Sequence, residues 1–341
     1  HLIHGRGRDK MSGISHNCTR TIGVNDTMSN SMNRRAFMQW SAGSALALTA
    51  VTAQAQVPEK KFQAGVSPWP LCLNTSTIRP TPFLEKIDVA AAAGYDAIEP
   101  WINELEDYEK GGGNLKDLGQ QIRDKGLFIP NIIGLWSCMP PTPELFEQSL
   151  EATRERMRRA AAVGSQHVAA IPSPDREDFD LAWGAEMYRR LLKIGREDYG
   201  IIVAFEFVGF LKGVHRLGQA CAIAIDANDA DACLISDTFH LFRGNSGFEG
   251  VQHLNGKMIA DFHFNDVPGD VPREEQGDEH RIYPGDGILP LKKLLQDLAA
   301  INYTGPLSLE MFNKAHWEQD PKQVAATGLE KMRSLIASAL A

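Results

Sequence analysis

The sequence has little cysteine, no long apolar run and no excess of positive charge. Its five cysteines, in 341 residues, show neither C-x-x-C nor zinc-finger spacing, so a metal site built from thiolates is not expected. Which cysteines pair, or whether they stay free thiols, does not follow from their positions. No apolar stretch reaches the roughly 20 residues that cross a bilayer, so we expect no membrane-spanning segment.

The charge balance argues against polyanionic partners. The formal net charge is −8. Residues 1–55 carry six Lys/Arg and two Asp/Glu, which leaves 29 basic and 41 acidic residues, or −12, for the rest of the chain. Such a surface does not favour a nucleic-acid backbone or an anionic membrane. A small anionic substrate, which needs only one local arginine, stays compatible with it.

The first 55 residues have the pattern of an export signal. Residues 33–39 read NRRAFMQ, an apolar run follows at 45–53, and an A-x-A site ends at Ala55. An arginine pair, a short apolar run and this site, in that order, are typical of a twin-arginine signal peptide. The plainer alternative is an amphipathic helix with two arginines. We expect export to the periplasm or beyond, a natural start near Met32, and a folded part over residues 56–341.

From residue 56 onward, strand-like runs alternate with helical patterns, without a linker that would divide domains. Eight strands are expected at 71–78, 95–101, 128–135, 167–171, 201–207, 232–237, 259–265 and 307–310. Eight helices are expected at 82–93, 115–125, 143–163, 179–199, 216–227, 248–254, 290–299 and 321–340. This alternation predicts an α/β protein, a single-domain (β/α)₈ TIM barrel. A doubly wound open sheet would want a glycine-rich turn after the first strand, and none is present.

Four side chains with metal-ligand chemistry stand at the ends of four expected strands: Glu206, Asp237, His263 and Glu310. Parallel barrel strands converge at their carboxyl ends, so these residues meet in space. Three carboxylates and an imidazole at one point repel each other unless a cation lies between them, and a divalent ion fits such ligands. Taken singly, each has a structural alternative: a paired core carboxylate, a helix N-cap, a satisfied core histidine or a strand-end charge.

The residues around these four extend the pattern to Glu206…Asp237-x-x-His240…His263…Arg281-x-x-Pro284-Gly-Asp-Gly287…Glu310. This spacing resembles the xylose isomerase-like TIM-barrel superfamily, in its sugar phosphate isomerase/epimerase branch with tagatose 3-epimerase and inosose isomerase/dehydratase relatives. The resemblance covers residues 62–340, and the tail after Glu310 is also similar to this branch.

The resemblance implies a role for each residue at a matching position. Glu206, Asp237, His263 and Glu310 would bind one divalent ion, and Mn²⁺, Mg²⁺ and Zn²⁺ all suit this donor set. Glu206 and Glu310 would also be the catalytic proton-transfer pair. His240 and Arg281 would contact substrate oxygens. For Arg281 a loop ion pair with a neighbouring acid is the plainer alternative.

Further residues are expected near the barrel mouth. Glu99 and Trp101 end the second strand and are expected to contact substrate, although a tryptophan there is also common packing. Asp266 follows His263 and is a candidate for orienting its ring, or simply begins a loop. The charged segment 266–286 reads as a lid or a solvated loop. Trp136 ends the third strand, where it either holds a sugar ring or packs, and His316 and Trp317 are further candidates for a place near the mouth.

Together these features predict a metal-dependent isomerase or epimerase that acts on a keto-sugar, keto-inositol or related polyol through an enediolate. A lyase or dehydratase with the same ion, inosose dehydratase-like or cleaving 3-keto-glycosides, is the alternative. Apurinic endonucleases share the fold but need histidines at strand ends two and three, where this chain has Glu99, Trp101 and Trp136. A sugar-binding barrel with a vestigial site is disfavoured because all four ligand positions are filled. We expect a small-molecule partner and allow for a homo-oligomer.

Overall fold

The structure is a computed structural model that describes residues 59–341. The predicted twin-arginine segment lies outside the described residues. Among the helices of the described part, none combines the length and apolar character needed to cross a membrane.

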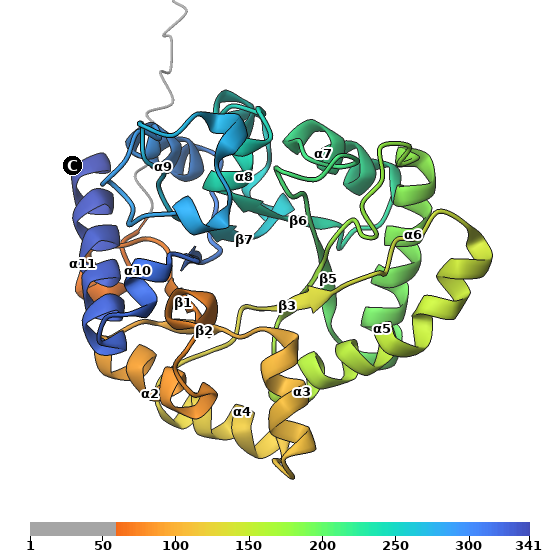
Figure 1. Cartoon of the computed structure of the whole chain (residues 1–341), viewed down its shortest axis with the longest axis horizontal. Coiled ribbons are helices and arrows are strands. Elements are labelled where there is room, and N and C mark those ends of the chain that lie inside the picture. The colour runs from red at the N-terminus through yellow and green to blue at the C-terminus, as the bar shows by residue number, and fades with distance from the viewer. Residues whose placement is uncertain (1–58) are drawn as a thin grey trace, which may run out of the picture. The chain divides into compact units, whose positions relative to one another are not determined.

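Eight parallel strands form one sheet that curls into a nearly closed barrel, as predicted (Figure 1). The strands are β1 (Leu71–Asn74), β2 (Ala97–Glu99), β3 (Asn131–Leu135), β4 (His167–Ala170), β5 (Ile202–Glu206), β6 (Cys233–Asp237), β7 (Ile259–His263) and β8 (Leu307–Leu309). Their order is β2-β1-β8-β7-β6-β5-β4-β3. Two parallel bridges, Ala97 with Phe128 and Trp101 with Ile133, bring the two edges together.

Helices surround the barrel and return the chain from each strand to the start of the next (Figure 1). They are α2 (Phe83–Ala93), α3 (Ile102–Lys110), α4 (Leu115–Asp124), α5 (Pro143–Val163), α6 (Leu181–Ile194), α7 (Leu217–Asp226), α8 (Thr238–Arg243), α9 (Leu291–Ala300), α10 (Lys314–Trp317) and α11 (Pro321–Ala339). Short single turns include η2 (Thr75–Ile78), η4 (Glu249–His253) and η7 (Asp278–His280). The expected stop signals act as such: Gly94 and Gly164 end α2 and α5 in the left-handed conformation.

The first strand and the helix expected at 248–254 differ from the prediction, and the helices α3, α8 and α10 were not predicted. The first strand ends at Asn74, four residues early, because the Asn74 side chain accepts from the N–H of Ser76 and starts a turn. The helix expected at 248–254 is only the short turn η4. A helix follows β6 at once instead, because Asp237 caps α8.

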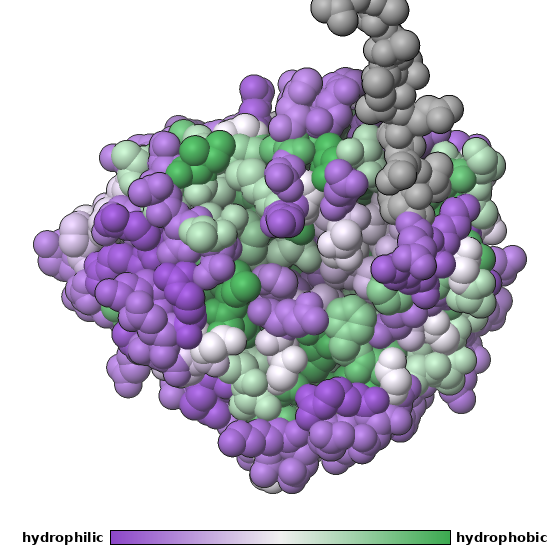
Figure 2. Space-filling model, turned by 180° about the vertical axis from the view of Figure 1, so that it is seen from behind, coloured by the Kyte–Doolittle hydropathy of each residue, from purple (hydrophilic) through white to green (hydrophobic). Residues whose placement is uncertain are grey.

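The buried residues form two layers. A small inner cluster fills the barrel with Ile133, Ala169, Ala204, Cys233, Ile235 and Ala260. A much larger cluster packs the outer faces of the strands against the helices. Cys72, Cys138, Cys221 and Cys233 are all free thiols. Figure 2 shows the face turned away from the viewer in Figure 1, where apolar residues are exposed between strongly hydrophilic patches.

Helix α4 approaches α5 closely, and a glycine makes the approach possible. A Cβ added at Gly119 would lie 2.1 Å from the carbonyl oxygen of Val163. We therefore expect Gly119→Ala to lower the free energy of unfolding by about 1–3 kcal/mol in urea denaturation. Gly218→Ala is the matched control, since nothing lies within 4 Å of its added Cβ, and it should be neutral or stabilising. Equal effects of the two substitutions would contradict this packing.

Candidate active site

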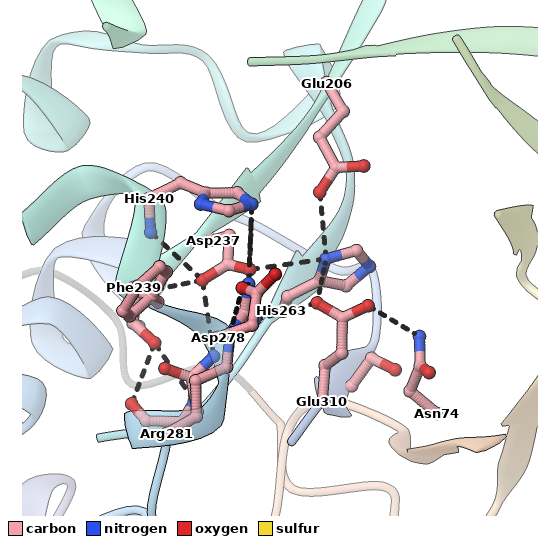
Figure 3. Close-up of polar contacts among 12 residues, drawn as sticks. Asn74, Glu206, Asp237, Phe239, His240, His263, Asp278, Arg281 and Glu310 are labelled. Carbon is pink, nitrogen blue, oxygen red and sulfur yellow. Dashed lines mark hydrogen bonds and ion pairs between the residues drawn. The ribbon is translucent and has the colours of Figure 1, made fainter. Parts of the chain in front are cut away.

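The four predicted ligand residues converge at the carboxyl ends of β5 to β8 (Figure 3). The distances are measured from Nδ1 of His263. Glu206 Oε1 lies 3.1 Å away, Glu310 Oε2 3.1 Å and Asp237 Oδ2 3.6 Å. Glu206 and Glu310 approach this nitrogen from opposite sides in Figure 3. All four side chains are buried.

The other ring nitrogen of His263, Nε2, is held by a buried carboxylate. Its Nε2 lies 3.1 Å from Glu99 Oε1, and Glu99 is wholly buried. Asn74, Asn131 and Ser308 donate to the same carboxylate. A hydrogen bond from Nε2–H to Glu99 leaves a lone pair on Nδ1, which then faces the three carboxylates.

Glu99 therefore reaches the imidazole of His263 and not the open mouth of the barrel. We predicted a substrate contact for this residue. Its contact with Nε2 of His263 instead suits a positioning role. Asn74, Asn131 and Ser308, which hold it, were not singled out in the sequence. Asparagine and serine are common at turns and strand ends, so nothing in their local pattern marks them.

The carboxylate of Asp237 serves two purposes at once. Its Oδ1 accepts from the N–H groups of Phe239 and His240, which caps α8. Its Oδ2 points to the centre, where it meets His263 and Arg281. The helix-cap interpretation and the ligand interpretation of Asp237 are therefore compatible.

Arg281 is fixed between the loop and the centre. Its guanidinium donates to Asp278 Oδ1 at 2.7 Å, which is the loop ion pair given as the alternative for this residue. The same group reaches Asp237 Oδ2 at 2.7 Å and Glu310 Oε2 at 2.8 Å. It is 1% exposed and lies over the ring of Phe239. Arg281 thus joins segment 266–286 to the ligand carboxylates.

His240 lies beside Arg281, with its Nε2 3.4 Å from the guanidinium. Burial lowers the pKa of His240 to about 4, so the ring is neutral at pH 7. Its Nδ1 is buried and has no hydrogen-bond partner among residues 59–341. A neutral imidazole with a free nitrogen can exchange a hydrogen bond with a substrate oxygen.

The ionisable groups of the centre have opposite pKa shifts. Burial, with repulsion from Glu310 and Asp237, raises the pKa of Glu206 to about 7 although His263 opposes the shift. Burial alone would raise the pKa of Asp237, but Arg281, His240 and His263 hold it well below its usual range. Burial disfavours a charged His263, yet the surrounding carboxylates outweigh it and raise the pKa of the ring.

The centre has an excess of negative charge that suits a divalent cation. The carboxylates of Glu99, Glu206, Asp237 and Glu310 surround His263, and the guanidinium of Arg281 contacts two of them, Asp237 and Glu310. A proton on His263 Nδ1 would offset one charge, but none of the three nearby oxygens meets hydrogen-bond geometry with that nitrogen. A cation, unlike a proton, needs only that these oxygens and the nitrogen converge on one point. Ligand atoms of Asp237, His263 and Glu310 lie within 4.8 Å of one another, as do those of Glu206, Asp237 and His240. These two clusters share Asp237 and form a candidate site for a divalent ion.

The remaining predicted residues fall at different places. Trp101 is half-buried and donates from Nε1 to Asn74, which in turn contacts Glu310. Trp136 stacks on Trp101 with ring centroids 5.7 Å apart. Trp317 donates to the backbone of Ser76, close to the same group.

Two residues take structural positions. Asp266 accepts from the N–H groups of Val267, Gly285 and Leu289, so it organises its own loop and does not orient His263. Of the two alternatives given for Asp266, the structure supports the one in which it begins a loop and not the one in which it orients the ring. His316 stacks on Tyr283 with ring centroids 4.4 Å apart.

A barrel of eight parallel strands with carboxylates and an imidazole at its carboxyl rim defines a class of TIM-barrel enzymes. The family model described as xylose isomerase-like TIM barrel matches residues 87–335. The chain belongs to this family.

Relatives and solved structures support the assignment. An inosose isomerase of Bacillus velezensis is 24% identical over 274 residues, which covers 78% of this chain and 96% of the relative. A 3-dehydroshikimate dehydratase of Pseudomonas aeruginosa is 26% identical over 250 residues, 73% of this chain and 39% of that protein. The structure of IOLI protein with a binding zinc atom aligns with a TM-score of 0.72 at 22% identity, covering 79% and 98% of the two chains. Isomerases, epimerases and dehydratases among the relatives make this chain an enzyme of the superfamily.

The buried Arg281 offers a test of the charge balance. Arg281→Met leaves Asp237 and Glu310 without their guanidinium, so we expect the free energy of unfolding of the metal-free protein to fall by about 3–5 kcal/mol at pH 8. Toward pH 5 the loss should shrink, because the unpaired carboxylates then take up protons. Arg189→Met, at an exposed ion pair on α6, is the control and should change little. Urea denaturation with EDTA measures both; a loss no larger than that of the control would contradict the assignment.

Proposed function

We propose that the protein is a divalent-metal-dependent isomerase or epimerase that acts on a keto-sugar, keto-inositol or related polyol. The observation that carries the proposal is the approach of Glu206 and Glu310 to one point from opposite sides. Two carboxylates so placed can remove a proton from one face of a carbon and return one to the other face, or to the next carbon.

Glu206 is suited to the role of first base. With a pKa of about 7, it is partly ionised at neutral pH and can both accept and release a proton. Asp237, His263 and the two glutamates would hold the ion, with Glu99 fixing the ring of His263. The ion, when bound, supplies Lewis-acid stabilisation of the negative charge that develops on the substrate oxygens.

His240 and Arg281 complete the pocket. Arg281 donates to Asp237 and Glu310, and Nδ1 of His240 is available to exchange a hydrogen bond with a substrate oxygen, so both would stabilise the charge that develops during proton removal. Arg281 is preorganised by its pair with Asp278, so little of its side-chain entropy is lost when substrate binds. Burial of the whole group excludes bulk water and strengthens these interactions.

A lyase or dehydratase is the second candidate, favoured by the dehydratase relative. The same proton removal next to a carbonyl can be followed by loss of a β-hydroxyl or β-alkoxy group instead of reprotonation. If residues 1–55 direct export, as we propose, a substrate without a phosphate group is expected.

Metal binding is the first prediction of this function. Isothermal titration should find one Mn²⁺, Mg²⁺ or Zn²⁺ per chain. Asp237→Asn should weaken it by more than about 100-fold while asparagine keeps the cap of α8. Glu279→Gln is the control, because this exposed acid pairs with His280 and not with a ligand residue.

Affinity should also rise between pH 6 and pH 8. Protons compete with the ion for Glu206, whose pKa is about 7, and for Nδ1 of His263. Wild-type protein that takes up no ion at either pH would contradict the metal site.

Deuterium exchange tests the proton-transfer pair. In deuterated water, D-fructose, L-ribulose, an inosose and 3-dehydroshikimate are incubated with the metal-loaded enzyme and followed by NMR. Label at one carbon with the skeleton retained indicates isomerisation, whereas loss of water indicates the lyase. Glu206→Gln and Glu310→Gln should each slow the reaction by roughly 10²–10⁴-fold, and Glu279→Gln should not. Equal rates in all variants would contradict the assigned roles.

A further inference from the structure

Asn74, at the end of β1, is a wholly buried amide with all of its hydrogen-bonding positions in use. Its Oδ1 accepts from the backbone N–H of Ser76 at 2.9 Å and from the indole N–H of Trp101 at 2.9 Å. Its Nδ2 donates to Glu99 Oε2 at 2.8 Å and to Glu310 Oε1 at 3.2 Å. An amide side chain accepts at most two hydrogen bonds through its oxygen and donates two. Asn74 therefore cannot turn without breaking at least one of these bonds.

The four partners also fix which end of the Asn74 amide is the oxygen. On one side lie two groups that only donate, a backbone N–H and an indole N–H, and on the other side lie two carboxylates. The reversed amide would place its NH₂ group against both donors and its oxygen against both carboxylates. Asn74 thus presents only donors to Glu99 and Glu310.

Trp101 has little room to move its N–H away from Asn74, because other side chains cover its ring. Trp136 stacks on it with ring centroids 5.7 Å apart, and Phe312 meets it edge-on, also at 5.7 Å. The guanidinium carbon of Arg79 lies 5.1 Å from the ring centre. Packing outside the centre therefore sets the direction of the indole N–H, and with it the position of the Asn74 amide.

Glu310 and Glu206, the two members of the proton-transfer pair, are held differently. Asn74 donates to Oε1 of Glu310 (Figure 3), and Arg281 donates to Oε2 of the same carboxylate at 2.8 Å. With Oε1 held by Asn74, Oε2 is the oxygen that lies 3.1 Å from His263 Nδ1. Within residues 59–341 the one ion-pair partner of Glu206 is the ring of His263. The protein thus orients the Glu310 carboxylate from two sides, and Glu206 has no matching donors.

We propose that Asn74 is a positioning residue for Glu310 and that Trp101 acts through it. The relay from Trp101 through Asn74 fixes the orientation of the Glu310 carboxylate before ion or substrate binds. In this role Trp101 serves the reaction through its indole N–H, from outside the centre. The inference rests on the proposed function for the role of Glu310 in proton transfer, whereas the orientation of its carboxylate is tested separately.

The first experiment compares Trp101→Phe with Trp317→Phe. Each substitution removes one indole N–H and keeps an aromatic ring, but the N–H of Trp317 donates to the backbone oxygen of Ser76 and not to Asn74. Deuterium exchange of D-fructose, L-ribulose, an inosose and 3-dehydroshikimate by the magnesium-loaded enzyme is followed by NMR over a range of substrate concentrations. Trp101→Phe should lower kcat by roughly 3–10-fold without changing KM, because a small displacement of a reacting group slows the chemical step. Trp317→Phe should change neither.

Asn74→Ala and Asn131→Ala separate the hold on Glu310 from the hold on Glu99. Both amides are wholly buried and donate to Glu99, but of the two only Asn74 also donates to Glu310. Asn74→Ala should lower kcat by roughly 10–100-fold, a clearly larger loss than that of Asn131→Ala. Its effect should almost vanish in a Glu310→Gln background and persist in full in a Glu206→Gln background.

The orientation of Glu310 can also be observed without any turnover. Crystal structures of the metal-free wild type, Asn74→Ala and Trp101→Phe show the conformers of both glutamates. Wild-type Glu310 should have one conformer with Oε1 on Asn74, and Asn74→Ala should turn or disorder this carboxylate while Glu206 stays as in the wild type. Trp101→Phe keeps the ring and the Ser76 bond to Asn74, so it gives a second variant should Asn74→Ala not fold. A smaller shift of Glu310 is expected there.

The outcomes distinguish this inference from the proposed function. Equal kcat losses within each pair of variants overturn the relay and leave the function standing. An Asn74→Ala effect that adds in full to that of Glu310→Gln does the same. A wild-type enzyme that exchanges deuterium into none of the four compounds removes the proposed function, and the crystal structures then decide on the relay. A displaced Glu310 carboxylate in the variants supports it, and an unmoved one overturns it.

Discussion

The site depends on the orientation of one imidazole. His263 stands between Glu99 below and three carboxylates above, and its two nitrogens have different tasks. The bond to Glu99 fixes which nitrogen keeps a lone pair, and the strand order fixes what that lone pair faces. Without Glu99 the ring would be free to turn, and the carboxylates would lack the neutral ligand that completes a cation site. The burial of Glu99 by Asn74, Asn131 and Ser308 therefore matters as much as the ligands themselves.

The negative charge of the centre is only partly balanced by the side chains around it. Arg281 neutralises part of the excess from within segment 266–286, and its own pair with Asp278 keeps it there. His240 stays neutral because it is buried beside that guanidinium, so it adds a polar contact without a further charge. What is left is a pocket that is negative by more than one charge and closed to bulk water. A bound divalent ion would balance the excess negative charge of this buried pocket.

Strand-to-helix alternation was enough to predict the barrel, because buried parallel strands are apolar on consecutive positions and stop signals such as Gly164 mark helix ends. The convergence of Glu206, Asp237, His263 and Glu310 followed from the same topology, since each stands at a strand end. Contacts that depend on the direction of a side chain could not be predicted from the sequence. Glu99 turns inward to His263, Asp266 binds its own loop, and Asp237 starts α8 at once. The aromatic contacts of Arg79 were also missed, because the three rings come from residues 101, 312 and 317, far apart in the chain.

The barrel rim is divided between two sets of strands. Those from β5 to β8 carry the acids and the imidazole, whereas the loops after β1 and β2 carry Arg79, Ser76 and Trp101. Several hydrogen bonds connect the halves, among them Asn74 to Glu310, Ser308 to Glu99 and Glu99 to His263. Asn74 and Glu99 therefore cannot vary without disturbing the reactive half, whereas exposed loop residues such as Arg79 can, so new specificity would arise in the loops while the old chemistry is kept.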